Sequence, residues 1–198
     1  KAADGAALND GLAQLREMND DFVGWMRIED TVVDYPVMKS SEDDPEFYLH
    51  RSFNKDDSSS GCLFVGAGCS LESTAFIVYG HKMSNDTMFG ILDSFADYDF
   101  ANTHQVVYLS TPFENRRYRV FASFQSKVYE PGEEGFRYYD NVGYLDKHHY
   151  EDVVESVRSL SLIDIKTAPA YPQQLLFLST CSYHTDDGRF VVVAYRED

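Results

Sequence analysis

The chain has 198 residues, of which 43% are hydrophobic, so it is long enough for one compact domain with a substantial core. Its net charge of −16, from Lys+Arg 17 against Asp+Glu 33, argues against a nucleic-acid partner, because phosphate binding needs a basic face. The sequence has no signal peptide and no run near the ~20 apolar residues of a membrane span, and it opens with linker-like residues, so a removed anchor would leave no trace.

The N-terminal part combines one helix with two strands. Apolar residues at helical spacing predict an amphipathic helix over residues 6–20, packed on the domain. Residues 24–28 and 32–38 are predicted to form two paired strands, with Pro36 at an edge or bulge. We therefore separate an N-terminal linker and helix (residues 1–22) from a single β domain that follows.

Two short helical segments are predicted before the middle of the chain. Asp44 and Pro45 have the residue types of an N-cap and a first helical position, and predict a turn through Leu49. Asp86 is predicted to cap a helix that runs through Phe95.

The other apolar runs are short and rich in β-branched or aromatic residues, which indicates strands. These predicted strands cover residues 61–66, 74–79, 105–111, 116–128, 175–178 and 190–195. Residues 129–143 have the composition of a loop, and residues 144–160 are predicted to be helical. Many short strands with few helices predict a mainly β protein with a closed or nearly closed barrel.

The three cysteines fall into two groups. Cys62 and Cys69 flank a stretch with hairpin composition, where they would either pair in a disulfide or remain as buried thiols. Cys181 has no cysteine near it in sequence, and follows directly on the predicted strand of residues 175–178 and the Ser-Thr pair after it. It is therefore the candidate for a reactive thiol.

Arg189 and His81 also lie at predicted strand ends. A polar loop with an Asp-Gly turn separates Cys181 from Arg189, so two strands hold a thiol and a guanidinium at one end of a sheet. His81 follows a predicted central strand through Gly80. A nucleophile, an acid–base group and an oxyanion-stabilising cation would need such positions. The other histidines, in loops or on a polar helix face, are predicted to be solvated: His50, His104, His148, His149 and His184.

Three separated segments resemble the signature segments of class B sortases of Gram-positive bacteria. They are residues 79–90 (YGHKMSNDTMFG), residues 178–183 (LSTCSY) and residues 188–193 (GRFVVV). The entry segment at residues 24–37 and the helix-bearing insertion at residues 144–160 are similar to those of the family as well. The resemblance extends from about residue 18 to the end of the chain, in the order that the family requires.

The resemblance implies a closed eight-stranded sortase-type barrel over residues 23–198, and peptide transpeptidation without a metal or an organic cofactor. On this sequence, Cys181 corresponds to the nucleophile, His81 to the acid–base group and Arg189 to the oxyanion-stabilising residue. The partners that the resemblance implies are a sorting-signal peptide of the Asn-Pro-x-Thr-Asn type and an amine of the peptidoglycan precursor. The implied location is the extracytoplasmic face of the plasma membrane, through an N-terminal anchor.

Candidate peptide contacts are Ser179, Thr180, Tyr183 and Leu49, and ordinary barrel packing is an equal alternative for each. The loop and helix of residues 129–160 are expected to form one wall of the peptide groove. Two departures from the family pattern are the pair of Cys62 and Cys69, and Ser182, where class B members often carry an acidic residue.

Several other functions are less consistent with the sequence. A papain-like protease would place its cysteine at a helix start near the N-terminus, with the histidine downstream. A zinc site would require Cys-x-x-Cys or His-Glu-x-x-His spacing, which is absent. A non-enzymatic surface β-barrel remains an alternative, as does a sortase that polymerises pilins through a lysine nucleophile.

Overall fold

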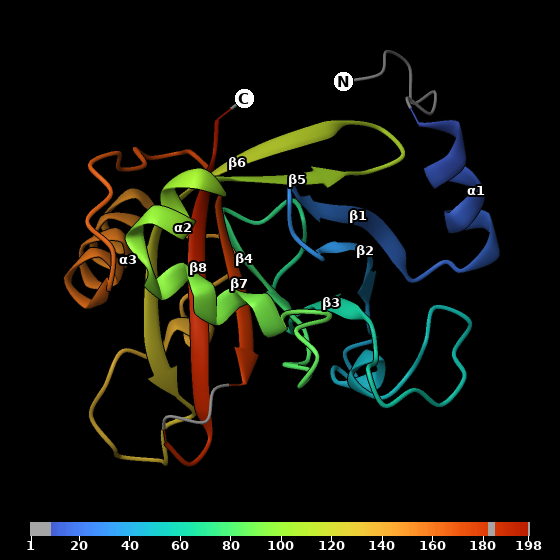
Figure 1. The fold of residues 1–198 in the computed structure, drawn as a ribbon, viewed down its shortest axis with the longest axis horizontal. Coiled ribbons are helices and arrows are strands. Elements are labelled where there is room, and N and C mark those ends of the chain that lie inside the picture. The colour runs from blue at the N-terminus through green and yellow to red at the C-terminus, as the bar shows by residue number, and fades with distance from the viewer. Residues whose placement is uncertain (1–8, 182–184, 198) are drawn as a thin grey trace.

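The computed structural model describes residues 9–181 and 185–197, and its strands close into a barrel (Figure 1). The order around the barrel is β1-β2-β3-β4-β7-β8-β6-β5. The strands are β1 (Phe22–Ile28), β2 (Asp34–Lys39), β3 (Leu63–Val65), β4 (Ala75–Tyr79), β5 (Val106–Ser110), β6 (Asn115–Lys127), β7 (Leu175–Cys181) and β8 (Gly188–Arg196). The prediction of a mainly β, eight-stranded closed barrel is confirmed.

The strands β4, β7 and β8 are apolar almost without interruption because they are covered on both faces. All residues from 175 to 180 in β7 are buried, and so are those from 190 to 195 in β8. The 3₁₀ helix Gly90–Ala96 packs against β6 and β8, and the helix α3 (Lys147–Leu160) packs against β6 on the outside of the barrel. Because both faces are buried, these strands do not show the alternation of apolar and polar residues that is typical of a sheet with one exposed face.

The predicted N-terminal helix is confirmed as α1 (Asp10–Met18), whereas residues 6–8 of the prediction lie outside the described residues. Its Leu12 and Leu15 pack against a small cluster around Phe22 and Tyr48. The predicted helix of residues 144–160 begins only at Lys147, because Asp146 caps it by accepting a hydrogen bond from the His149 N–H. No helix in the described ranges has the length and hydropathy needed to cross a membrane.

Two predicted helix starts are wrong. Asp86 does not cap a helix, because Met88, inside the predicted helix, has a left-handed backbone (φ 54°), and a 3₁₀ helix begins only at Gly90, with Phe89 before it. Asp44 is not an N-cap, because the turn there is the 3₁₀ segment Phe47–Leu49, preceded by Glu46. The helix α2 (Tyr98–Thr103), which is only six residues long, was not predicted.

The region around Cys62 and Cys69 is not a hairpin between the two residues. The strand β3 between them pairs with β2 and β4 instead, and both cysteines are free, buried thiols. Burial raises the pKa of the Cys62 thiol to about 11, so this thiol stays protonated and unreactive near neutral pH. Pro36 lies in β2 opposite Trp25 of β1, and the pairing of β2 with β3 begins only at Val37, so Pro36 has no partner in β3.

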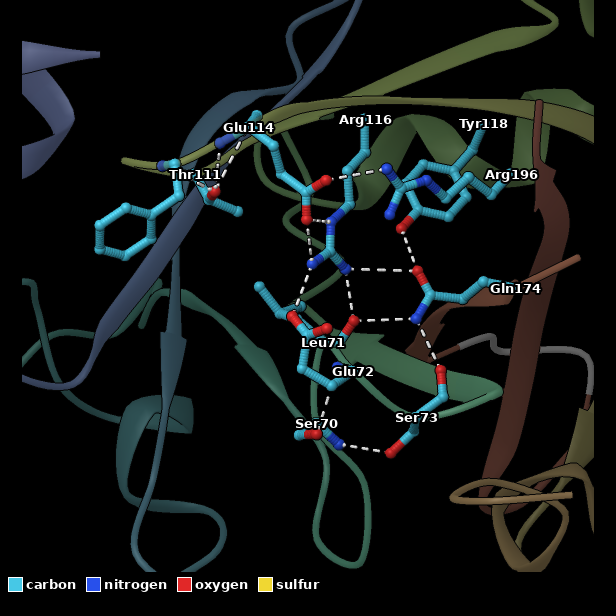
Figure 2. A network of polar contacts seen from close by, with 11 residues as sticks. Ser70, Leu71, Glu72, Ser73, Thr111, Glu114, Arg116, Tyr118, Gln174 and Arg196 are labelled. Atoms are coloured by element: carbon cyan, nitrogen blue, oxygen red, sulfur yellow. Dashed lines mark hydrogen bonds and ion pairs between the residues drawn. The ribbon is translucent and has the colours of Figure 1, made fainter. Parts of the chain in front are cut away.

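A buried polar network joins β6, β7 and β8 at one end of the barrel (Figure 2). The Arg116 side chain is only 2% exposed, and forms ion pairs with Glu114 (2.7 Å) and Glu72 (2.7 Å). Arg196 also pairs with Glu114, at 2.9 Å. Gln174 accepts a hydrogen bond from the Tyr118 hydroxyl (2.6 Å) and donates to the Ser73 carbonyl (2.6 Å). We call this set, Glu72, Glu114, Arg116, Tyr118, Gln174 and Arg196, the basal network.

Candidate active site

The strands β4, β7 and β8 bring the three predicted catalytic residues to the barrel end opposite the basal network. β4 and β7 are parallel, with Tyr79 paired to Ser179, so that His81 and Cys181 each stand two residues further along neighbouring strands. The pairing is continued beyond β4, because the Gly80 N–H donates to the Ser179 carbonyl (3.2 Å) and the Thr180 hydroxyl donates to the Gly80 carbonyl (2.8 Å). On the other side of β7, Cys181 is the antiparallel partner of Arg189. Only the backbone of Cys181 is described. The register pairs it with Arg189, and the β4–β7 pairing ends at Tyr79 and Ser179, two residues before His81 and Cys181.

The His81 ring is held by a backbone carbonyl. Its Nε2 atom lies 2.7 Å from the Leu49 oxygen, and the ring is partly buried. The His50 ring lies 5.9 Å away, centroid to centroid. A carbonyl oxygen only accepts hydrogen bonds, so Nε2 is the donor in this contact.

The Arg189 side chain is half-buried beside Tyr79. Its Nη1 atom donates to the carbonyls of Asp187 (3.1 Å) and Gly188 (3.0 Å). Burial raises the pKa of the Tyr79 phenol well above its usual value, and the positive charge of Arg189 acts in the opposite direction. Both residues line the same cavity at this end of the barrel.

A cavity of about 370 Å³ opens at this end of the barrel. Its lining includes His81 and Arg189 together with three of the four predicted peptide contacts, Leu49, Ser179 and Thr180. The fourth, Tyr183, lies outside the described residues, as does His184. The remaining lining residues are Pro45, Glu46, Phe64, Gly66, Ala67, Tyr79, Gly80, Val128, Tyr138 and Tyr139.

Ser179 and Thr180 make hydrogen bonds within the protein. Ser179 is fully buried, and its hydroxyl lies 2.9 Å from that of Tyr138. Thr180 is 2% exposed and donates to the Gly80 carbonyl. Their role as peptide contacts stays a prediction, and the hydrogen bonds show that both side chains also fix the geometry of the cavity.

The aromatic wall of the cavity was not predicted residue by residue. Tyr138 and Tyr139 lie on a 3₁₀ turn within the loop of residues 129–143, whereas no residue of α3 lines the cavity. The predicted wall of residues 129–160 is therefore formed by its loop part. A signal in the sequence was the pair of tyrosines within an otherwise polar loop, which buries Tyr138 against Phe124 and Phe177.

Arg137 fixes the shape of this wall. Its guanidinium donates to the carbonyls of Tyr129 (2.8 Å), Glu130 and Glu133 (3.3 Å), and lies over the Tyr129 ring. The Tyr139 hydroxyl accepts a hydrogen bond from the Tyr129 N–H at 2.9 Å. One planar cation thus satisfies several loop carbonyls and closes the loop on itself.

His104, His148 and His149 make local contacts away from the cavity lining. His104 stacks on Phe100 with ring centroids 4.0 Å apart, and His149 lies 2.7 Å from the Asn141 side-chain oxygen. His148 is exposed beside Asp152. Within residues 9–181 and 185–197, no three His, Cys, Asp or Glu side chains are grouped so that they could hold a metal ion.

Comparison with known proteins gives one consistent result. A family model described as the Sortase domain matches residues 26–197. A Listeria monocytogenes protein named Sortase B is 29% identical, over 93% of this chain and 73% of its own length. The crystal structure of Clostridium perfringens sortase B is 30% identical, with a TM-score of 0.82, over 94% of this chain and 99% of that one. A Staphylococcus aureus sortase B–substrate complex has the same fold, with a TM-score of 0.80 at 21% identity over 97% of this chain and 86% of that one.

Proposed function

The chain belongs to the sortase family and is a class B sortase transpeptidase, and we propose that Cys181, His81 and Arg189 carry its reaction. The substrate in this proposal is the sorting signal of a surface protein, with an Asn-Pro-x-Thr-Asn-like sequence. The observation that carries the proposal is the strand register, which places residues 81, 181 and 189 on three adjacent strand ends beside one cavity.

The first half of the proposed reaction cleaves the sorting signal. The Cys181 thiolate attacks the scissile carbonyl carbon, and Arg189 stabilises the negative oxygen that forms, an effect typically worth ~3–4 kcal/mol for one well-placed donor. The peptide C–N bond then breaks, and a thioester remains on Cys181. The amine cannot leave as an anion, so His81 gives it a proton.

The second half transfers the acyl group. The amine of a peptidoglycan precursor loses its proton to His81 and attacks the thioester carbon. A new C–N bond forms, and the Cys181 thiolate is released. Transfer wins over hydrolysis when this amine reaches the thioester before water does.

Peptide binding in this proposal uses the cavity at the same barrel end. Leu49 supplies an apolar contact, Ser179 and Thr180 border the scissile bond next to the nucleophile, and Tyr183 is the fourth proposed contact. A substrate complex of a similar sortase B supports a peptide ligand for this fold. Sortases act at the cell surface of Gram-positive bacteria, and an N-terminal membrane anchor is part of the proposal for this protein.

A peptide-library cleavage assay with a panel of amine acceptors tests the proposal. We expect cleavage of Asn-Pro-x-Thr-Asn-like peptides, a thioester adduct by intact-mass spectrometry, and a new amide product with cell-wall cross-bridge amines. A product formed only with lysine side chains of pilin-like peptides would support pilin polymerisation instead. Absence of any adduct across the library would leave a non-enzymatic barrel as the better explanation.

A further inference from the structure

The 3₁₀ turn Phe47–Leu49 supplies the carbonyl that binds His81. The Leu49 oxygen accepts from Nε2 at 2.7 Å, although the two residues are 32 positions apart in sequence. This contact fixes which ring nitrogen carries a proton. Nε2–H is present in the neutral ring and in the imidazolium, so the proton that is gained and lost must be on Nδ1.

The buried side chain of Tyr48 fixes the position of this turn. This side chain is fully buried, and its hydroxyl donates to the Asp21 carboxylate (2.8 Å) and accepts from the Asn19 amide (2.9 Å). The Tyr48 carbonyl accepts a hydrogen bond from the Cys62 N–H at 2.9 Å. Leu49 directly follows Tyr48 in sequence, so the hydrogen bonds and burial of Tyr48 restrict the position of the Leu49 carbonyl.

The backbone at Gly61 packs closely against this turn. It has a left-handed backbone (φ +57°), and a Cβ atom there would lie 2.5 Å from both the Leu49 oxygen and the Tyr48 oxygen. No Cβ atom tolerates such a distance to backbone atoms, so a side chain at residue 61 must displace the turn. The absence of a side chain at Gly61 thus permits the position of the Leu49 carbonyl.

We propose that the Leu49 carbonyl, held in place by Tyr48 and by close backbone contact with Gly61, is the positioning group for His81. It fixes the ring orientation, keeps a proton on Nε2 in both protonation states, and assigns proton exchange with the reacting groups to Nδ1. The catalytic meaning of this arrangement rests on the proposed function, in which His81 is the acid–base group. The arrangement of the ring itself does not.

The test compares two glycine substitutions that differ in one respect. Gly61→Ala and Gly68→Ala both place alanine at a left-handed position (φ +57° and +71°), but a Cβ at Gly68 meets nothing within 4 Å. Both variants carry the backbone strain of alanine at positive φ. Only Gly61→Ala displaces the Leu49 carbonyl.

The first measurement is the ring 15N spectrum of His81 in the Cys181→Ala protein, assigned by the signals lost in His81→Gln. We expect a neutral ring with its proton on Nε2, and slow exchange of that proton with water, in the parent and in Gly68→Ala. In Gly61→Ala we expect that slow exchange to be lost. A neutral parent ring protonated on Nδ1 would overturn the proposal, and this result needs no variant to fold.

The second measurement is turnover of a sorting-motif peptide with Cys181 intact. We expect kcat to fall at least about tenfold in Gly61→Ala, because general acid–base catalysis typically contributes 10²–10⁴-fold. We expect Gly68→Ala to stay within about twofold of the parent. Unchanged turnover and unchanged proton exchange in a folded Gly61→Ala protein would refute the positioning role. A parent with the expected ring signature but without transpeptidation would instead contradict the proposed function alone.

Discussion

The same strands carry two very different ends. At one end, β6, β7 and β8 are joined by the basal network, in which Arg116 and Glu114 are buried and form ion pairs with each other (Figure 2). At the other end, Arg189 is half-buried and donates to backbone carbonyls, and His81 donates to another. Buried ion pairs neutralise charge inside the protein at the basal end. At the cavity end, which we call the catalytic end after the proposed function, the contacts described for Arg189 and His81 are with backbone carbonyls.

The difference teaches how a barrel can hold a polar site without losing stability. A buried charge is costly unless it is paired, and breaking such a pair typically costs 3–5 kcal/mol. A half-exposed cation keeps part of its hydration, and its removal affects folding less. Substitutions at the basal end should therefore change stability with little effect on chemistry, and those at the catalytic end should do the reverse.

The largest effect is expected for the proposed nucleophile. Cys181→Ala should abolish the covalent adduct with sorting-motif peptides, because alanine has no atom that can form the thioester. The urea midpoint should change little. Intact-mass spectrometry after incubation with peptide is the measurement, and an adduct that survives in the variant would exclude Cys181 as the nucleophile.

The next effect belongs to the basal end. Arg116→Leu should lower the free energy of unfolding by about 3–5 kcal/mol, because it leaves the buried Glu114 with one cation fewer. The matched control is Arg117→Leu, whose pair with Glu197 is 43% exposed on the arginine side and should cost at most about 1 kcal/mol. Urea unfolding gives both values. A loss of activity in folded Arg116→Leu protein that exceeds its loss in the control would break the separation of the two ends.

Arg189→Lys tests the catalytic end again, with a smaller change. One ammonium group cannot replace a planar guanidinium fork, so we expect kcat/KM to fall at least about tenfold, equal to about 1.4 kcal/mol of transition-state stabilisation. Peptide turnover with an amine acceptor is the measurement. Near-normal turnover would remove the proposed role of Arg189.

Much of this architecture could be predicted from the sequence because its signals are local. Short β-branched runs at residues 74–79, 175–178 and 190–195 predicted the strands, and the resemblance to sortases predicted catalytic roles for the residues at their ends. The wrong predictions of helix starts occur where the backbone conformation of single residues determines the structure. Nothing in the residue type of Met88 reveals its left-handed φ, which interrupts the helix predicted from Asp86 to Phe95.

The contacts that complete the site depend on tertiary packing, and were therefore missed. The Leu49 side chain was predicted as a peptide contact, but its carbonyl binds His81 across a distance of 32 residues in sequence. Arg137 and the tyrosines of the cavity wall lie in a segment with loop composition and no periodicity. Apart from the Glu114–Arg116 pair, the basal network joins residues far apart in sequence, from 44 positions for Arg116–Glu72 to 82 for Arg196–Glu114.

Arg137 gives a weaker prediction at the catalytic end, because it shapes the cavity wall. Arg137→Gln should raise KM for the peptide by about three- to tenfold, about 0.7–1.4 kcal/mol, with a smaller change in kcat, because the loop must be ordered on binding. The exposed Arg158 on α3 provides the control, and Arg158→Gln should leave KM unchanged. A fall in kcat with constant KM in Arg137→Gln would indicate a role in the chemical step instead.

The smallest effect is a difference in pH and salt dependence between the two ends. At the basal end burial raises the pKa of Glu114, but hydrogen bonds from Arg196 and Arg116 outweigh it and lower the pKa below 4.5. Its stabilisation is then present above the unfolded pKa, and is lost as pH falls through the lower folded pKa. Lys127 likewise lowers the pKa of Glu133 near the catalytic end, where the pair is exposed.

Urea midpoints from about pH 7 to about pH 3 should therefore fall less steeply in Glu114→Gln than in the parent protein. Raising the salt concentration to about 1 M shortens the screening length to about 3 Å. In this salt, the pH dependence of the urea midpoint should be the same for Glu133→Gln as for the parent protein. The pH dependence of the urea midpoint should still differ between Glu114→Gln and the parent protein in salt, because a buried ion pair is screened much less. Equal salt sensitivity of the two variants would mean that water reaches Glu114, and that the basal end is no more closed than the catalytic one.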